Sequence, residues 1–284
     1  VLIGTIFIFS GHEPDNAEIE AMKAAGTYSE FLRHETMRVV NPYLVLAGIT
    51  LLWALLILLS RFPKVNEEDH GNAKIEGTKG GIRNLFRHRH FVLGVLAQFF
   101  YIGAQVGTWS YFIQYVQDYA GLPEKSAGMM LTLSLIVFLI GRFIATGLMQ
   151  KIKPNMLMGI YAIFNIVLVA LGIGLPLSAY GMASFDAATM NPLFGWIGII
   201  AVLMTSFFMS LMFPTIFALG IKGLGNDTKM GASFIVMAII GGAIFTPLMG
   251  LIAVDSMALA MLIPFGCYIF VAYYAFRGSK EIRT

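Results

Sequence analysis

Five residues in one apolar stretch combine side-chain types that suit a sugar ligand. Within residues 91–116 they recur at steps of three and four: Gln98, Tyr101, Gln105, Trp109 and Phe112. That spacing places them on one face of a helix. Amide groups exchange hydrogen bonds with hydroxyls, and aromatic rings stack on the apolar face of a pyranose. We therefore expect this face to line a cavity for a monosaccharide, the alternative being hydrogen bonding between packed membrane helices.

Arg142 is the one charged residue in the interior of the apolar stretches, which otherwise lack Asp, Glu, Lys and His. A charge at membrane depth must be offset. We expect Arg142 either to pair with polar loop groups in one conformation, as part of a gate, or to extend its guanidinium to the nearby cytoplasmic surface. Asn165, near the middle of a later stretch, is expected to form a packing hydrogen bond rather than to contact a ligand.

Two later stretches contain residues that interrupt helices. Pro214 lies within residues 193–219 and removes a backbone hydrogen bond, so it predicts a bend. Residues 229–252 contain Gly241, Gly242 and Pro247, which predict a second flexible point. Interrupted helices in transporters border the binding site or move when access changes, although Gly and Pro are also frequent in ordinary membrane helices.

The elements that position these residues are membrane spans. Of the 284 residues 57% are hydrophobic and the mean hydropathy is +0.76, outside the range of soluble globular proteins. A bilayer needs roughly 20 apolar helical residues per crossing. Seven stretches qualify: 42–60, 91–116, 127–149, 155–177, 193–219, 229–252 and 256–276. The sequence therefore predicts an all-α integral membrane protein.

Basic residues alternate with the spans. Cytoplasmic loops are enriched in Lys and Arg, which cluster in 61–90 and then mark every second connection: Lys151, Lys153, Lys222, Lys229, Arg277, Lys280 and Arg283. The loops 178–192 and 253–256 contain neither, 117–126 has only Lys125, and the segment 11–41 is acidic. We expect these four to face outside.

Composition also narrows the partners. The net charge of +3 is explained by basic loops beside spans, so no nucleic-acid partner is expected. The five His residues lie in loops without metal-ligand spacing, and neither a metal nor a cofactor is predicted. The spans contain no paired carboxylates and no Ser/His arrangement, which argues against an intramembrane enzyme. With no carboxylate at midplane, the groups of an ion-coupled carrier are expected elsewhere in the protein.

Three segments are expected from the order of these features. Residues 1–10 are apolar but about half a span, and we interpret them as the end of a helix. Residues 61–90 form a cytoplasmic linker that ends in Ile82, Leu85 and Phe86 at helical spacing. That end is either a surface helix at the lipid headgroups or an ordinary basic segment before the membrane. The six spans after it fall into two groups of three, as in transporter lobes built from inverted repeats.

The chain resembles the fucose:proton symporter family of the major facilitator superfamily, which includes fucose permease and bacterial glucose/galactose transporters. The resemblance lies in GRF at 141–143, AQFFYIGAQVGTWSYFIQYV at 97–116, NPYLVLAGITLLWALLILLSRFP at 41–63 and FPTIFALGIKGLGNDTKMGASFIVMAIIGGAIFTPLMG at 213–250. It implies a twelve-helix fold of two lobes. Residues 1–60 would be the end of the N-terminal lobe with helix six, 61–90 the linker, and 91–284 the C-terminal six-helix lobe.

The resemblance also implies a function. It is proton-coupled symport of a fucose-, galactose- or glucose-type monosaccharide, by alternating access, in the inner membrane of a bacterium and by a monomer. Gln98, Tyr101, Gln105 and Trp109 would contact the sugar, and the span with Phe213 would face the same cavity. Asp227 and Lys229 would help to latch a closed state. The alternative is a membrane sensor or scaffold with this fold, which does not transport.

Overall fold

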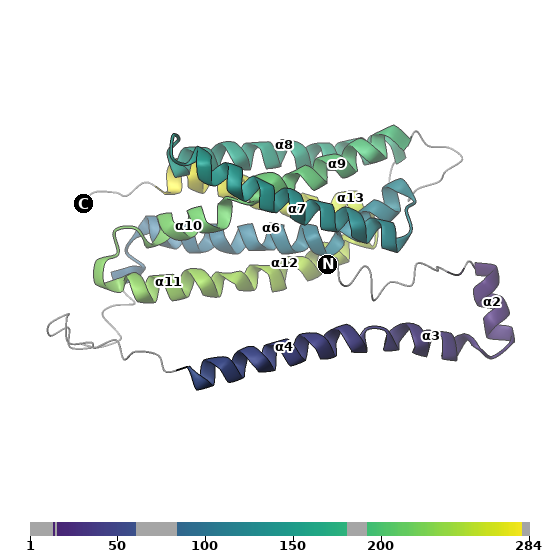
Figure 1. The fold of residues 1–284 in the computed structure, drawn as a ribbon. Coiled ribbons are helices and arrows are strands. Elements are labelled where there is room, and N and C mark those ends of the chain that lie inside the picture. The colour runs from purple at the N-terminus through teal and green to yellow at the C-terminus, as the bar shows by residue number, and fades with distance from the viewer. Residues whose placement is uncertain (1–13, 15, 61–83, 181–191, 280–284) are drawn as a thin grey trace. The chain divides into compact units, whose positions relative to one another are not determined.

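The computed structural model describes residue 14 and residues 16–60, 84–180 and 192–279. All regular elements in these ranges are helical, and seven helices there are long and apolar enough to cross a membrane. They coincide with the seven predicted stretches, so the prediction of a multi-pass helical membrane protein is confirmed (Figure 1). Residues 1–10 and most of the predicted linker lie outside the described residues.

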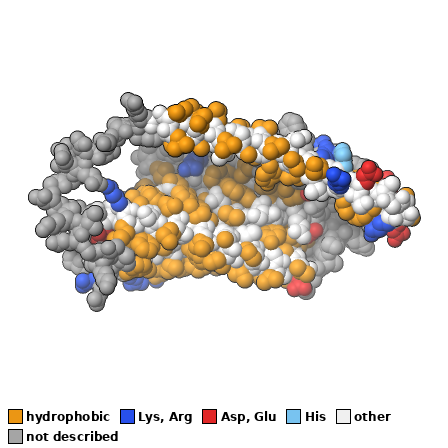
Figure 2. All heavy atoms as spheres, turned by 90° about the horizontal axis from the view of Figure 1, so that it is seen from below, with side chains coloured by type: hydrophobic (Ala, Val, Ile, Leu, Met, Phe, Trp, Pro, Cys, Tyr) orange, Lys and Arg blue, Asp and Glu red, His pale blue; other side chains and the backbone are white. Residues whose placement is uncertain are grey.

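Packing divides the chain into two compact units. Unit 1 comprises residues 1–76 with 123–129, and unit 2 comprises 77–122 with 130–284. The described part of unit 1 holds α2 (Asn16–Ala24), α3 (Tyr28–Met37) and α4 (Val40–Leu59). Gly26, at a φ of 72°, allows the tight turn between α2 and α3. None of the residues of α4 is buried, and hydrophobic side chains extend along its length (Figure 2).

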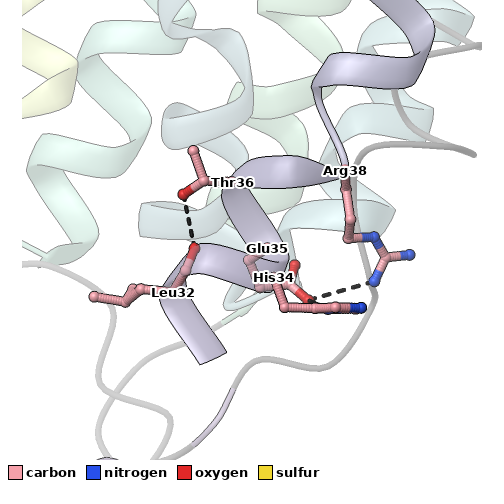
Figure 3. Close-up of polar contacts among 5 residues, drawn as sticks. All are labelled: Leu32, His34, Glu35, Thr36 and Arg38. Atoms are coloured by element: carbon pink, nitrogen blue, oxygen red, sulfur yellow. Dashed lines mark hydrogen bonds and ion pairs between the residues drawn. The ribbon is translucent and has the colours of Figure 1, made fainter. Parts of the chain in front are cut away.

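Charged side chains of unit 1 gather on α2 and α3, before the apolar helix begins (Figure 2). On α3 the Glu35 carboxylate accepts a hydrogen bond from Arg38 Nη1 at 3.4 Å and lies 3.9 Å from His34 Nδ1 (Figure 3). On the adjacent residue, the Thr36 hydroxyl donates to the Leu32 carbonyl one turn earlier in α3, at 2.7 Å (Figure 3). Exposed pairs of this kind contribute little to stability. They show that polar and charged side chains gather at this end of the span, as expected for a helix end in contact with water.

Unit 2 contains the remaining helices. Their bounds are α6 (Arg89–Ala120), α7 (Glu124–Leu148, in this unit from Met130), α8 (Pro154–Tyr180), α9 (Pro192–Met209), α10 (Met212–Ile221), α11 (Thr228–Met237), α12 (Gly241–Ala253), α13 (Met257–Ala260) and α14 (Leu262–Tyr273). Short turns of another pitch, η2 (Gly225–Asp227), η3 (Ala238–Ile240) and η4 (Tyr274–Gly278), link or extend them. The helix α6 contacts α9, α10, α12 and α14, and Figure 1 shows it between α9 and α12. It is the central helix of the unit.

Small residues bring α6 and α12 together. A side-chain carbon at Gly103 would lie within 2.2 Å of the Phe245 ring, and one at Gly107 within 2.3 Å of Met249 Sδ. The two glycines form a G-x-x-x-G pattern, which lets membrane helices approach closely. On α12 the same closeness recurs at Gly241, where such a carbon would lie 2.0 Å from the Phe99 carbonyl oxygen.

The end of the predicted linker packs on protein rather than on lipid. Leu85 is fully buried in a cluster with Phe91, Leu224 and Ile235. Phe86 is half exposed, with its ring edge-on to Phe91. Leu85 therefore does not contact lipid headgroups, because the first turn of α6 and the loop after α10 cover its side chain. This part of the surface-helix interpretation is wrong. Ile82 lies outside the described residues.

Candidate sugar-contact face of α6

The five residues of the predicted stripe differ in exposure. Gln98, Tyr101 and Phe112 are buried inside unit 2, with exposed fractions of 0%, 0% and 1%. Gln105 and Trp109, one turn apart, are half-buried. Helical spacing correctly places all five on one side of α6, and neighbouring helices then cover part of that side. Gln105 and Trp109 are the two members of the stripe that keep exposed surface in unit 2.

Trp109 on α6 is held in one orientation by side chains of two neighbouring helices, α7 and α9. Its indole N–H donates a hydrogen bond to Ser206 Oγ on α9 at 3.0 Å. Ser206 and Ser134 of α7 share a second hydrogen bond of 2.6 Å between buried hydroxyls. The ring also meets Phe138 edge-on, with centroids 5.2 Å apart. A half-exposed ring fixed in this way is suited to stack on a sugar, because little conformational freedom is lost on binding.

Tyr101 contacts the point where the span formed by α9 and α10 is interrupted. Its hydroxyl donates to the Met209 carbonyl at 3.0 Å, at the end of α9. Residues 210 and 211 are not helical, and α10 starts at Met212. Pro214 explains the interruption, because it has no N–H for the Ser210 carbonyl four residues earlier and its ring crowds that carbonyl, which favours a new helix that begins just before the proline. Phe213 beside it is half-buried.

Gln98 is an unsatisfied buried amide. Neither its Nε2 nor its Oε1 has a hydrogen-bond partner among the described residues. The amide of Asn165 on α8 is likewise buried without a partner there, so the packing hydrogen bond expected for Asn165 is absent from the described part of the chain. A buried amide without partners costs free energy, which makes both residues candidates for a functional role.

Arg142 follows a close helix contact. A side-chain carbon at Gly141 would lie 2.6 Å from the Phe207 carbonyl oxygen and 2.9 Å from Ser210 Oγ. Thus α7 touches α9 beside the interruption. Arg142 itself is exposed and takes part in none of the ion pairs seen between described residues. Its pairing with a loop stays a prediction.

The other predicted conformational residues lie in two places. The span after α10 is interrupted at η3, directly before Gly241 and Gly242. Gly242 packs on Val106 and Ile102, so the glycine pair serves close packing against α6. Pro247 is exposed on α12.

In the loop after α10, Asp227 accepts a hydrogen bond from Asn84 Nδ2 at 3.3 Å, while Lys229 is exposed. The structure thus connects Asp227 to the segment before α6. The role of Asp227 and Lys229 in latching a closed state stays a prediction.

The sequence analysis missed two features of this site, a serine pair and a glycine pair. It did not find that Ser134 and Ser206 hold Trp109, because nothing in their local sequence distinguishes them from other hydroxyls in membrane helices. The Gly103–Gly107 pair had a readable signal in its spacing. Among the described residues no group of three His, Cys, Asp or Glu side chains could hold a metal ion.

Comparison with known proteins shows the family. The family model described as Major Facilitator Superfamily matches residues 36–190. The L-fucose-proton symporter of Escherichia coli K12 is 37% identical over 278 residues, 97% of this chain and 59% of that protein. A putative glucose/galactose transporter of Helicobacter pylori (strain ATCC 700392 / 26695) is 32% identical over 99% of this chain and 62% of its own. The chain thus spans less than two thirds of the length of these relatives.

A solved structure agrees. The crystal structure of a Major Facilitator Superfamily transporter, FucP, in the outward conformation matches with a TM-score of 0.68 and 34% identity, over 99% of this chain and 65% of that one. These relatives are transporters and not enzymes, as the sequence predicts. The chain is therefore a member of the Major Facilitator Superfamily and is similar to its fucose-proton symporters over nearly its whole length.

Proposed function

We propose that this protein carries a monosaccharide across the membrane by secondary active transport. The observation that carries the proposal is the 37% identity to a protein named L-fucose-proton symporter, maintained along 97% of the chain. The substrate is a sugar of the fucose, galactose or glucose type, since other relatives are named glucose/galactose transporters. Unit 2 would be one of the two lobes between which the sugar binds.

Within unit 2 the sugar contacts are assigned to the half-buried pair on α6. Trp109 would stack on the apolar face of the ring, and the Gln105 amide would exchange hydrogen bonds with hydroxyls. Gln98, Tyr101 and Phe112 lie deeper and would support this pair or become accessible when helices move. Phe213, beside the interruption of the next span, would add an aromatic contact.

Alternating access would use the interrupted spans as the moving parts. The break at Ser210 and Leu211, caused by Pro214, lets α10 tilt independently of α9. The pair Gly241 and Gly242, with Pro247, would serve the next span in the same way. Arg142, Asp227 and Lys229 lie toward the basic ends of helices and would form contacts that differ between the inward and outward states.

The coupling ion would be a proton. Because the middle of each span in unit 2 lacks Asp and Glu, the protonated carboxylates would lie outside this unit. The relatives are bacterial, which supports the inner membrane of a bacterium as the location, with the protein working as a monomer.

Counterflow tests the proposal. Proteoliposomes of the full-length protein, preloaded with unlabelled L-fucose, D-galactose or D-glucose, are diluted into a trace of the labelled sugar. A transporter accumulates label transiently, and a proton symporter also alkalinises the external medium when sugar flows inward without preloading. Sugar binding without counterflow would identify a sensor instead, and counterflow without alkalinisation would remove the proton from the proposal.

A further inference from the structure

A pocket opens at the basic end of unit 2, away from the α6 face. Its volume is about 490 Å³, within the range of small-molecule sites. It lies where three helix ends meet: the end of α7 at Met149, the start of α8 at Lys153 to Asn155, and the last two turns of α10 up to Lys222. None of its lining residues belongs to the candidate sugar face.

The polar groups of this pocket favour an anion. Lys153, directly before α8, and Lys222, directly after α10, are exposed cationic residues that line it, and the lining also includes Asn155. The helix α8 begins at Pro154, and its first N–H groups have no acceptor within the helix. The positive end of a 27-residue helix therefore adds to the two lysines. The described residues that line the pocket include no carboxylate.

The remaining lining is apolar and lies at the membrane surface. Ala218, Leu219 and Pro214 form the α10 wall. The Thr215 hydroxyl donates a hydrogen bond to the Leu211 carbonyl at 2.9 Å, so its proton is already used within the chain. The pocket lies at the helix ends marked by Lys, which are the cytoplasmic ends. A molecule that fits has a phosphate beside an apolar body and approaches at headgroup depth.

We propose that this pocket binds the headgroup of an anionic glycerophospholipid from the cytoplasmic leaflet. The phosphate would lie between Lys153, Lys222 and the start of α8, and the glycerol and first acyl carbons would lie against Ala218 and Leu219. Basic pockets between membrane helices on this side bind anionic headgroups in the same way. A bound lipid would contact the ends of α7, α8 and α10 together. It would therefore contact α10, the helix that starts after the interruption at Ser210 and Leu211.

Titration of the full-length protein with phosphatidylglycerol in a phosphatidylcholine background, followed by native mass spectrometry, tests the site. The wild type is expected to retain one phosphatidylglycerol in preference to phosphatidylcholine. Lys153→Gln with Lys222→Gln should weaken this binding about thirty-fold, since each cation near the surface contributes roughly a factor of five. The matched control, Lys151→Gln with Lys229→Gln, removes two charges from the same end but none from the pocket, and should leave it within about twofold.

A second pair of variants works through shape instead of charge. Ala218→Phe fills the pocket and should abolish the preference, while Ala170→Phe on an exposed position of α8 should not. Equal losses in both lysine pairs would mean diffuse attraction and would overturn the site. So would wild-type retention in Ala218→Phe, the absence of a bound phosphatidylglycerol, or equally tight binding of soluble glycerol 1-phosphate.

Discussion

Trp109 is oriented by three side chains from two neighbouring helices, α7 and α9. Its N–H reaches Ser206 on α9, which in turn bonds Ser134 on α7, and Phe138 lies against the ring. Each of these three polar side chains has a hydrogen-bond partner, so the indole cannot rotate without breaking a buried hydrogen bond. A preorganised ring is what stacking on a sugar requires.

Ser206→Ala removes the acceptor of the Trp109 N–H. We expect the free energy of unfolding to fall by about 1–2 kcal/mol, because a buried donor loses its partner. Sugar binding should also weaken as the ring becomes mobile. Thermal unfolding and tryptophan fluorescence of the purified protein measure both effects. Ser233→Ala, at an exposed hydroxyl that donates to the Lys229 carbonyl, is the control and should change neither. Equal behaviour of the two variants would contradict the assigned role.

Gln105→Ala tests the other half of the pair. Loss of its hydrogen bonds should raise the dissociation constant of the sugar about tenfold while leaving membrane insertion intact. Isothermal titration with a panel of hexoses and deoxyhexoses gives the constants. Gln114→Ala lies nine residues further and therefore on the opposite side of α6, and it should bind normally. Unchanged binding of every sugar by the Gln105 variant would exclude Gln105 from the site.

At this scale the sequence predicts which residues share a face but not which of them are covered. Steps of three and four residues correctly grouped Gln98 and Tyr101 with Gln105 and Trp109. The burial of the first two depends on the packing of other helices against α6, and this packing leaves no trace in the sequence of α6. The hydrogen bond from Tyr101 to the Met209 carbonyl joins α6 to the end of α9, and nothing in the local sequence of either helix indicates it.

Close packing of α6 and α12 is the main feature at the scale of elements. Gly103 and Gly107 face Phe245 and Met249, and Gly241 faces the backbone at Phe99. Small residues let membrane helices approach closely and gain van der Waals contact, because no hydrophobic driving force brings helices together inside the bilayer. The sequence predicted flexibility at Gly241, and the structure adds a packing reason for the same glycine. Pro214 was easier to interpret, because a missing N–H acts on its own helix.

Gly241→Ala should therefore be damaging. The new methyl group would overlap the Phe99 carbonyl oxygen, and we expect a loss of about 2 kcal/mol in unfolding free energy. Gly174→Ala, in α8 with nothing within 4 Å of the added carbon, should be neutral or stabilise by about 0.5–1 kcal/mol. Circular dichroism during thermal unfolding compares them. If the two alanines have the same effect, the helices are not in the close contact described.

At the scale of the whole molecule, membrane topology follows from charge. The span count was predictable because the bilayer sets a minimum apolar length, and it agrees with the seven long apolar helices among the described residues. The orientation stays a prediction, made from the Lys and Arg that accumulate at alternate connections. The arrangement of α6 at the centre of its unit was not predictable, since every span is apolar on most of its surface. The arrangement of the helices is supported instead by similarity to a solved transporter structure, because the hydrophobic periodicity does not determine it.

Cysteine labelling tests this orientation. With Cys267 replaced by Ala, Asp255→Cys should react with a membrane-impermeant maleimide in intact cells, because the connection before α13 is predicted to face outside. Lys229→Cys, at the start of α11, should react only after permeabilisation. Both side chains are exposed, so access to the reagent decides the result. The reverse pattern would invert the topology.

The central claim is that the α6 face bearing Gln105 and Trp109 lines a water-filled cavity that binds a monosaccharide. Alkylation of the Gln105→Cys variant with a water-soluble maleimide, with and without sugar, measures this directly. Cys267, the one cysteine among these 284 residues, is 2% exposed, and cysteines elsewhere in the full-length protein are replaced by Ser beforehand to keep the background low. We predict that the thiol introduced by Gln105→Cys reacts and that the transported sugar slows its reaction, while the thiol introduced by Gln114→Cys is unaffected by sugar. Failure of the first thiol to react, or the same rate with every sugar tested, would contradict the claim.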